Sequence, residues 1–330
     1  MITSTIRFNF ALPGQDPAEN TRRHQAAVAM AEAADRAGLT SISLEEHHGV
    51  RFDDQLLGWC ASPITLAAAM LARTQTVTVA LWGLALPLHD PIRIAEDVAT
   101  LDLLAPGRVV LIVNTGYREI EFVAHGRDFA QRAETFDTNL ELLRAAWTQE
   151  HIDRSDTLVS VTPRPVTRPH PTLMVSGATV ADAERAAAHG LAFRPSADEP
   201  QLRQAYEQGC EAAGHSPLYL APPATVRIVQ VADDPDEWWA AVGPNLLREA
   251  QIYASWMNPG EHSAVHSRAT TVDELRAEGR YRVLTPPQCV QEARRDQSVL
   301  LHPLCGGTPL DRAERTVELF VDEVLPHLDA

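Results

Sequence analysis

Short apolar segments alternate with helical segments eight times along this chain of 330 residues. The predicted strands are residues 6–10, 41–44, 77–81, 109–113, 172–175, 191–193, 226–231 and 299–302. The predicted helices include residues 18–37, 62–73, 91–104, 136–147, 179–189, 202–213, 237–256 and 310–325. Strict alternation is typical of a parallel sheet. Eight units, with polar residues at strand carboxyl ends, favour a closed (β/α)8 TIM barrel over an open sheet. We therefore predict an α/β fold and a single domain over 1–330.

The second predicted strand ends at four ionisable side chains, Glu45, Glu46, His47 and His48. In a chain of alternating strands and helices, polar groups at a strand's carboxyl end line a site more often than a core. We expect this cluster to mark the functional site. The alternative is that the two histidines only form hydrogen bonds within their own loop.

The composition excludes several classes of function. All 28 basic side chains are arginine, so chemistry that needs a lysine amine, such as a pyridoxal Schiff base or a P-loop, is excluded. The net charge of −16 argues against nucleic acid or an anionic membrane surface as a partner. The sequence shows neither a signal-peptide pattern nor an apolar run of membrane-spanning length, so we expect a soluble, cytoplasmic protein.

The cysteines and histidines do not predict a metal site. Cys60, Cys210, Cys289 and Cys305 lack Cys-x-x-Cys spacing, which fits a reducing compartment better than a disulfide framework or a zinc site. Barrel enzymes such as metal hydrolases take ligands from several strands, and adjacent histidines on one loop lack that spread.

Two further segments have an expected role. Residues 258–283, between the seventh and eighth strands, are polar, weakly periodic and longer than an ordinary connection, which predicts an insertion that acts as a mobile lid. The helix beginning at Ser62-Pro63 is apolar nearly all round, whereas an outer barrel helix keeps one polar face. A homodimer that buries this helix is therefore expected; an alanine-rich compositional bias is the alternative.

Several short motifs follow one another in a characteristic order along the chain. They are Glu46-His47-His48, Pro91 with Ala95-Glu96-Asp97 and Leu101-Asp102, Gly107-Arg108, Gly116-Tyr117-Arg118 with Glu121-Phe122, Gly126 and Arg132, and Asp322-Glu323-Val324-Leu325-Pro326. Each is weak alone, but in this order and spacing the chain resembles the bacterial-luciferase-like flavin-dependent monooxygenases almost from end to end.

The resemblance implies a barrel that binds reduced FMN (FMNH2) delivered by a separate flavin reductase. The reduced flavin reacts with O2 to give a peroxyflavin, which oxygenates a small organic substrate. Such an intermediate decays when water reaches it, so the site is expected to be closed and largely apolar. His48, Trp59, Trp82 and Trp256 are assigned to the substrate pocket on this basis. Hydroxylation, Baeyer–Villiger insertion, carbon–carbon cleavage and N-oxidation all stay open.

The resemblance also implies roles for single residues. His47 falls on the family's catalytic histidine, and Glu46, in preference to Glu45, is expected to orient its imidazole. Gly83-Leu84 falls where relatives carry a non-proline cis peptide beneath the flavin ring. The flavin phosphate is expected at Ser176-Gly177-Ala178-Thr179, where small residues let backbone N–H groups approach an anion. The alternative is that Thr179 and Asp182 form only a helix capping box.

The loop Asn114-Thr115-Gly116-Tyr117 is also assigned to the cofactor, and here the chain departs from luciferase. Thr115 stands where luciferase has a phosphate-binding arginine, and Asn114 replaces its reactive cysteine. Either another arginine, Arg118 or Arg194, binds the phosphate, or the flavin is held weakly.

Two other functions stay open. One is a deazaflavin-dependent hydride-transfer oxidoreductase of the same superfamily, and the other is a non-catalytic luciferase-like subunit. The Glu-Glu-His-His stretch, and the lack of an obvious basic groove for a polyglutamate tail, favour FMN over the deazaflavin. Retention of His47 favours a catalytic chain.

Overall fold

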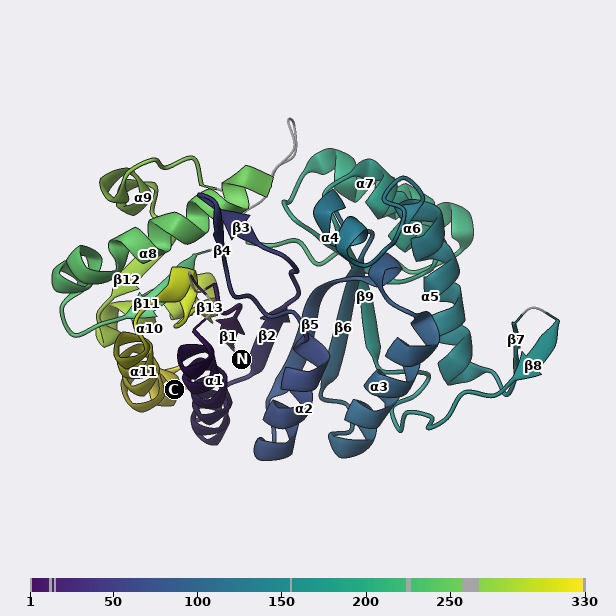
Figure 1. Ribbon diagram of the computed structural model, residues 1–330, viewed down its shortest axis with the longest axis horizontal. Helices are drawn as coiled ribbons and strands as arrows, with labels where there is room; N and C mark the ends of the chain where they lie inside the picture. The colour runs from purple at the N-terminus through teal and green to yellow at the C-terminus, as the bar shows by residue number, and fades with distance from the viewer. Residues whose placement is uncertain are drawn as a thin grey trace. The chain divides into compact units, whose positions relative to one another are not determined.

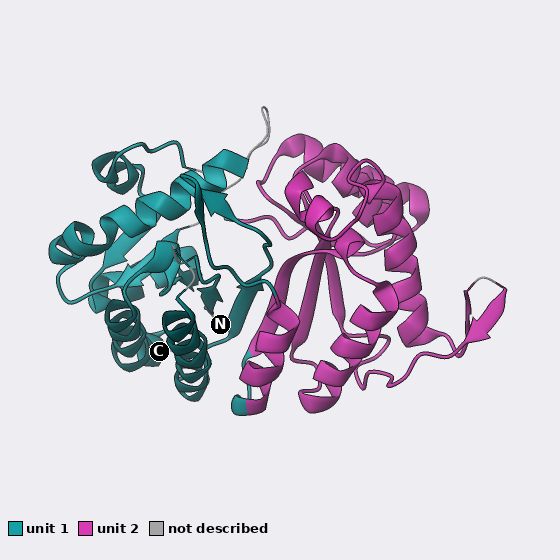
Figure 2. Ribbon diagram, viewed as in Figure 1, with its two compact units in different colours: residues 1–61, 73–77, 223–330 teal, residues 62–72, 78–222 magenta. Residues whose placement is uncertain are grey.

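The computed structural model describes residues 2–11, 14, 16–154, 156–223, 227–256 and 267–328. The chain forms two compact units, which Figure 2 shows in teal and magenta. Unit 1 comprises residues 1–61, 73–77 and 223–330, and unit 2 comprises residues 62–72 and 78–222. The single domain over 1–330 stays a prediction.

Unit 1 is built on parallel strands in the order β2-β1-β13-β11-β12 (Figure 1). These strands are β1 (Thr3–Phe8), β2 (Ser41–Glu45), β11 (Ile228–Val231), β12 (Tyr281–Leu284) and β13 (Ser298–Leu301). The helices are α1 (Pro17–Arg36), α8 (Pro235–Trp256), α9 (Val272–Glu278), α10 (Pro286–Asp296) and α11 (Leu310–Leu319). A small hairpin, β3 (Arg51–Phe52) and β4 (Gln55–Leu56), and the turns η2 (Cys305–Gly307), η3 (Phe320–Val324) and η4 (Leu325–His327) complete it.

Unit 2 is built on parallel strands in the order β10-β9-β6-β5. These strands are β5 (Thr78–Ala85), β6 (Val109–Asn114), β9 (Thr172–Gly177) and β10 (Ala192–Pro195). The helices are α2 (Pro63–Arg73), η1 (Leu86–Leu88), α3 (Pro91–Leu104), α4 (Glu119–Ala124), α5 (Arg132–Thr148), α6 (Val180–Ala188) and α7 (Pro200–Ala213). The hairpin of β7 (Ile152–Arg154) and β8 (Thr157–Val159) interrupts the alternation between α5 and β9.

Each of the eight predicted strands corresponds to a parallel strand, although Val226 lies outside the described residues. The sequence reading missed β12 and α10, and it treated the α9 region as part of a structureless lid. Residues 258–266 of that span lie outside the described residues, while the rest contains α9 and the start of β12. Arg280 and Arg282 flank the first residue of the four-residue β12 and hid its apolar pattern, in which Tyr281, Val283 and Leu284 are buried.

Asp35, one residue before the end of α1, holds the segment that leads into β5. Its carboxylate accepts hydrogen bonds from the backbone N–H groups of Gln75 (2.7 Å), Thr76 (2.9 Å) and Val77 (2.7 Å), and from the Thr76 hydroxyl (2.7 Å). Burial opposes ionisation, but these four donors lower the pKa of Asp35 below its ordinary value. The buried carboxylate therefore replaces backbone partners that the turn leaves unpaired.

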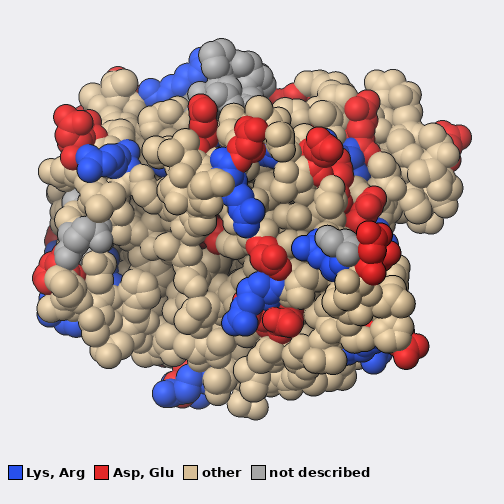
Figure 3. Space-filling model, turned by 45° about the vertical axis from the view of Figure 1, so that its right-hand side comes forward, with Lys and Arg blue, Asp and Glu red and all other residues tan. Residues whose placement is uncertain are grey.

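Acidic and basic side chains lie next to one another on the face drawn in Figure 3, so the net charge does not appear there as one negative field. Exposed ion pairs of the described residues include Arg312 with Glu237 (2.6 Å) and Arg315 with Asp233 (3.0 Å). Within the described part of the chain, no helix is both long and apolar enough to cross a membrane.

Candidate active site

His47 lies among three aromatic side chains of unit 1. Its ring centroid is 5.6 Å from Trp59, 6.3 Å from Tyr253 and 4.6 Å from Trp256. Those three rings also contact one another, at centroid distances of 5.1 to 5.9 Å. We call His47, Trp59, Tyr253 and Trp256 the aromatic cluster. Because His47 and Trp59 are buried, the cluster keeps most water away from the imidazole.

Backbone hydrogen bonds hold this loop on the carboxyl ends of β1 and β2. The N–H of His47 donates to the carbonyl of Cys60 (3.4 Å), and the N–H of Cys60 donates to the carbonyl of Asn9 (2.9 Å). Ile42 and Leu44 of β2 are fully buried, so the apolar alternation of the strand anchors the polar residues that follow it. Tyr253 and Trp256 come from the last turns of α8.

Glu45 connects the aromatic cluster to a buried arginine. Its carboxylate lies 2.9 Å from the Arg7 guanidinium and accepts a hydrogen bond from the Tyr253 hydroxyl (2.6 Å). Burial and the charge of Glu45 raise the pKa of Tyr253 well above its ordinary value, so the phenol keeps its proton and donates a hydrogen bond to Glu45. Burial works against the charge of Arg7, but Glu45 and its neighbours raise the pKa of Arg7 above its ordinary value.

The role expected of Glu46, to orient the His47 imidazole, stays a prediction. Glu46 Oε1 lies 3.4 Å from His48 Nε2, while Glu45 holds the Tyr253 ring next to His47. Sequence reasoning missed Tyr253 and Arg7. The signal for Arg7 was an arginine between two apolar residues of the predicted strand, Ile6 and Phe8, which has to be paired if the strand is buried.

A second polar cluster is fully buried in unit 1, and sequence reasoning missed it too. Glu249 of α8 accepts hydrogen bonds from the Asn9 side chain (2.8 Å) and from the N–H of Gly306, and its Oε1 lies 3.3 Å from His302 Nδ1. Burial raises the pKa of Glu249 to about 7 and, together with Arg7, lowers that of His302 well below its ordinary value. His302 directly follows β13, so the rule that identified His47 applies to it as well.

In unit 2, Gly83 bends β5 where the cofactor was expected. Gly83 has φ of +72°, and the β5–β6 register shifts between Trp82 and Leu84. Asn114 holds the bend, because its side-chain nitrogen donates to the Gly83 carbonyl (3.2 Å) and its oxygen accepts from the Gly116 N–H (2.9 Å). The predicted non-proline cis peptide at Gly83–Leu84 is wrong: among the described residues the cis bonds precede Pro163 and Pro169. A left-handed glycine and a bulge make the bend instead.

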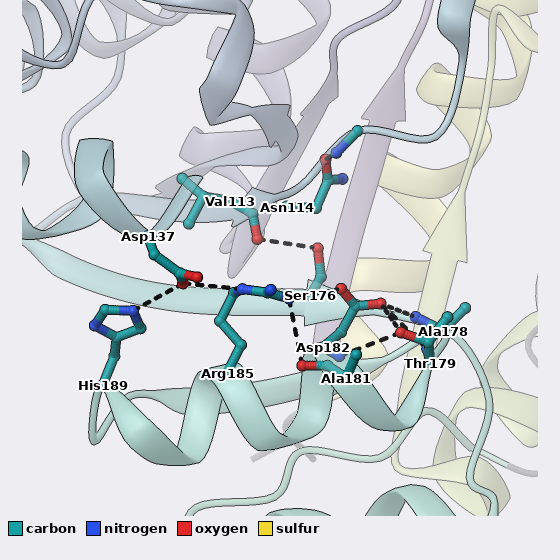
Figure 4. Close-up of polar contacts among 11 residues, drawn as sticks. Val113, Asn114, Asp137, Ser176, Ala178, Thr179, Ala181, Asp182, Arg185 and His189 are labelled. Carbon is teal, nitrogen blue, oxygen red and sulfur yellow. Dashed lines mark hydrogen bonds and ion pairs between the residues drawn. The ribbon is translucent and has the colours of Figure 1, made fainter. Parts of the chain in front are cut away.

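The phosphate loop predicted at residues 176–179 contains the capping box that was its alternative reading. Figure 4 shows the Asp182 carboxylate turned toward Ala178 and Thr179, whose backbone N–H groups both donate to its Oδ2 (3.2 Å each). The Thr179 hydroxyl also donates to Asp182 (2.7 Å). Two of the backbone donors expected to bind an anion are therefore already occupied. Ser176 points the other way, toward the Val113 carbonyl (3.5 Å).

The two arginines considered as replacements at Thr115 have different surroundings. The Arg118 guanidinium is buried and lies 2.6 Å from Glu121, so its charge is already compensated. Arg194 lies at the carboxyl end of β10, opposite Ser176 of β9, and stacks 4.5 Å above the Trp82 ring. Burial lowers the pKa of Arg194, and no described residue forms an ion pair with it.

The remaining predicted residues of this loop differ in exposure. Thr115 is half-buried, Tyr117 is exposed, and Gly116 is packed so closely that a Cβ would lie 2.7 Å from the Phe122 ring. The predicted site residues thus fall into two sets. Unit 1 brings together His47, Trp59 and Trp256, and unit 2 brings together the ends of β5, β6, β9 and β10.

These features agree with comparisons to known proteins. The model of the luciferase-like monooxygenase family matches residues 6–322, so the chain belongs to this family. An uncharacterised protein of Mycobacterium tuberculosis is 36% identical over 118 residues, which are 34% of this chain and 40% of that protein. The alkanal monooxygenase alpha chain of Photorhabdus luminescens is 25% identical over 189 residues, 56% of this chain and 51% of that one. The chain thus spans about half or less of these relatives.

Solved structures match over nearly the whole chain. A monooxygenase from Streptomyces bottropensis has a TM-score of 0.73 at 25% identity and covers 99% of both chains. The oxygenating constituent of 3,6-diketocamphane monooxygenase from Pseudomonas putida, in complex with FMN, has a TM-score of 0.67 at 16% identity and 98% coverage of both. An F420-dependent secondary alcohol dehydrogenase reaches 0.66 at 15% identity and 99% coverage of both. The predicted luciferase-like TIM-barrel fold is confirmed.

Proposed function

We propose that this chain is a two-component flavin-dependent monooxygenase, which takes FMNH2 from a separate reductase and uses O2 to oxygenate a small organic substrate. The observation that carries the proposal is the burial of His47 within the aromatic cluster at the carboxyl end of β2. When bound, reduced flavin supplies the reaction with O2. The protein residues bind, exclude water and handle protons.

His47 is the residue that holds or moves a proton in this proposal. An imidazole can accept a proton at one ring nitrogen and donate one from the other, which suits it to this role. Trp59 and Trp256 cover the imidazole and limit the access of water, which otherwise diverts oxygen chemistry to peroxide. Glu45 acts indirectly, since its hydrogen bond fixes the Tyr253 ring against His47.

The residues of unit 2 fit a phosphorylated flavin. Arg194 offers a guanidinium with no carboxylate partner among the described residues, and Ser176 is its register partner on the neighbouring strand. A guanidinium binds a phosphate through two parallel hydrogen bonds, which a neutral hydroxyl cannot match. We therefore assign the phosphate contact to Arg194 in place of Thr115, and the ring environment to Gly83, Leu84 and Asn114.

The proposal is tested by mixing the anaerobic complex of the chain and FMNH2 with O2 and following hydrogen peroxide release. Wild type should release peroxide more slowly than free FMNH2. His47→Asn should change the rate of this release by about 100-fold, the lower range for the contribution of a proton-transfer group. His151→Asn, on the exposed β7–β8 hairpin, is the matched control. Equal release from His47→Asn and wild type would remove His47 from the mechanism.

Anaerobic titration of the chain with each reduced cofactor separates the other two functions. Binding of reduced deazaflavin but not of FMNH2 would indicate a hydride-transfer enzyme, in keeping with the F420-dependent structural neighbour. Binding of neither cofactor would indicate a non-catalytic subunit. We further propose a single catalytic domain, a cytoplasmic location and a homodimer, for which the half-buried Ile64 and Leu66 of α2 offer apolar surface.

A further inference from the structure

Three potential metal ligands meet in the core of unit 1. Glu249 of α8, His302 after β13 and Cys305 of η2 each place one donor atom within 4.8 Å of the other two. All three residues are completely buried. Glu249 lies more than fifty residues before His302 and Cys305 in the sequence, so only the folded chain brings it to the other two.

The imidazole of His302 lacks the partners that a buried histidine needs. Neither Nδ1 nor Nε2 has a hydrogen-bond partner of acceptable geometry among the described residues, although Nδ1 lies 3.3 Å from Glu249 Oε1. An unpaired buried polar atom costs about 1–3 kcal/mol, and two on one ring call for an explanation. Burial and the nearby Arg7 lower the pKa of His302 well below its ordinary value. The ring is therefore neutral, the form in which histidine binds a metal.

We propose that Glu249, His302 and Cys305 bind one zinc ion in the core of unit 1. Nitrogen, sulfur and carboxylate oxygen are the donors that zinc uses in proteins. Because the ligands are inaccessible to solvent, this ion would stabilise the fold rather than act on a substrate. The proposal does not depend on the oxygenation chemistry proposed above.

Charge supports a divalent cation at this position. Arg7 and Glu45 already form a pair at 2.9 Å, so Glu249 is left as an additional buried acid. Burial and the Glu249 charge raise the pKa of the Cys305 thiol, and coordination would deprotonate it. A zinc ion with one carboxylate, one thiolate and one neutral imidazole forms a neutral set, which avoids the cost of an isolated buried charge.

The geometry requires only a small contraction. A point central to three atoms that lie within 4.8 Å of one another is at most about 2.8 Å from each, against about 2.0–2.3 Å for bonds from zinc to nitrogen, oxygen and sulfur. Small rotations of the three side chains supply the difference. Hydrogen bonds from Asn9 and Gly306 already fix both oxygens of the Glu249 carboxylate, as is usual for carboxylates that bind metals.

The alternative is a proton in place of the metal. Burial raises the pKa of Glu249 to about 7, so a protonated carboxyl beside His302 would also be neutral. The two states differ in a measurable way: the first contains zinc and a thiolate, and the second contains neither. Metal content therefore decides between them without an activity assay.

The experiment measures zinc by mass spectrometry in the full-length chain, purified without added metal or affinity tag. We expect about one zinc per chain in wild type, and at least a tenfold loss in Cys305→Ser and in His302→Gln. Cys289→Ser is the matched control, because Cys289 is as buried as Cys305 but lies outside the set. This control should keep its zinc.

A second measurement needs no variant that has to fold. Wild type is unfolded, stripped with a chelator and refolded with Co²⁺, which should produce absorption from a cobalt–thiolate bond. Wild type that contains no zinc and gives no such absorption would overturn the proposal and leave the protonated Glu249–His302 pair. Zinc that persists in Cys305→Ser and His302→Gln would also overturn it, as an ion bound elsewhere on the chain.

Discussion

Arg194→Ala removes the one guanidinium that unit 2 offers to the flavin phosphate in our proposal. Arg194 lies at the carboxyl end of β10, opposite Ser176, and has no ion-pair partner among the described residues. The alternative arginine, Arg118, is bound to Glu121 at 2.6 Å and would have to break that buried pair to reach an anion. Flavin affinity should therefore depend on Arg194.

The size of the effect follows from the type of contact. A hydrogen bond to a charged group contributes about 1.5–3 kcal/mol, and each 1.4 kcal/mol is about tenfold in Kd. Arg194→Ala should thus weaken FMN binding about 10- to 150-fold. Riboflavin has the same ring system without the phosphate, so its affinity should change less than about threefold. Arg194→Lys should fall between, because it keeps the charge without the planar pair of donors.

Equilibrium titration of both flavins, followed by fluorescence, measures this difference. Arg203→Ala is the matched control, since Arg203 stacks 4.2 Å above Tyr219 much as Arg194 stacks above Trp82, but is bound to Asp198 at 3.0 Å. An equal loss of FMN and riboflavin affinity in Arg194→Ala would show that only the Trp82 contact was disturbed. Unchanged FMN affinity would refute the assignment outright.

Three further predictions concern stability and assembly. Asp35→Asn should lower the free energy of unfolding by about 2 kcal/mol at pH 7, measured by urea titration. Because the folded state lowers the pKa of Asp35, this loss should shrink as the pH falls below the ordinary aspartate pKa; a constant loss would contradict the role of the carboxylate. Gly306→Ala should lower the free energy of unfolding by at least about 3 kcal/mol, since its Cβ would lie 1.8 Å from the Asn245 carbonyl oxygen. Gly126→Ala is the control, because Gly126 also has a positive φ but its Cβ would meet open space, and it should cost about 1–2 kcal/mol. Light scattering at micromolar concentration should give the mass of a dimer, and a monomer mass would exclude it.

The strand pattern was predictable because each strand carries its own apolar signal. Val109 to Val113 is a run of β-branched residues and leucine, and Ile228 to Val231 contains a single polar residue, Gln230, so both read as buried strands whatever they pair with. β12 was missed for the opposite reason. Its three buried side chains, Tyr281, Val283 and Leu284, are interrupted by Arg282 within only four residues, and its partner β11 lies more than fifty residues earlier in the sequence.

The candidate site was only half predictable, because part of it depends on pairing across the fold. His47 could be predicted from the sequence because it lies at the carboxyl end of a strand. The role of Glu45, in contrast, depends on Arg7 of β1 and Tyr253 of α8, which meet it only in the folded chain. The preference for Glu46 as the residue that orients His47 stays a prediction.

The cysteines also show that a site formed across the fold cannot be found from sequence spacing. Spacing alone argued against a zinc site, because ligands close in sequence are what a sequence pattern can detect. Cys305 lies three residues from His302, a spacing that has no meaning until Glu249 of α8 packs against both. Burial then changes the chemistry of all three residues, because an acid, an imidazole and a thiol cannot share a dry core at no cost unless a proton or a metal ion balances them. A cluster of this kind is therefore found by asking which buried polar atoms lack partners, a question that only the folded chain can answer.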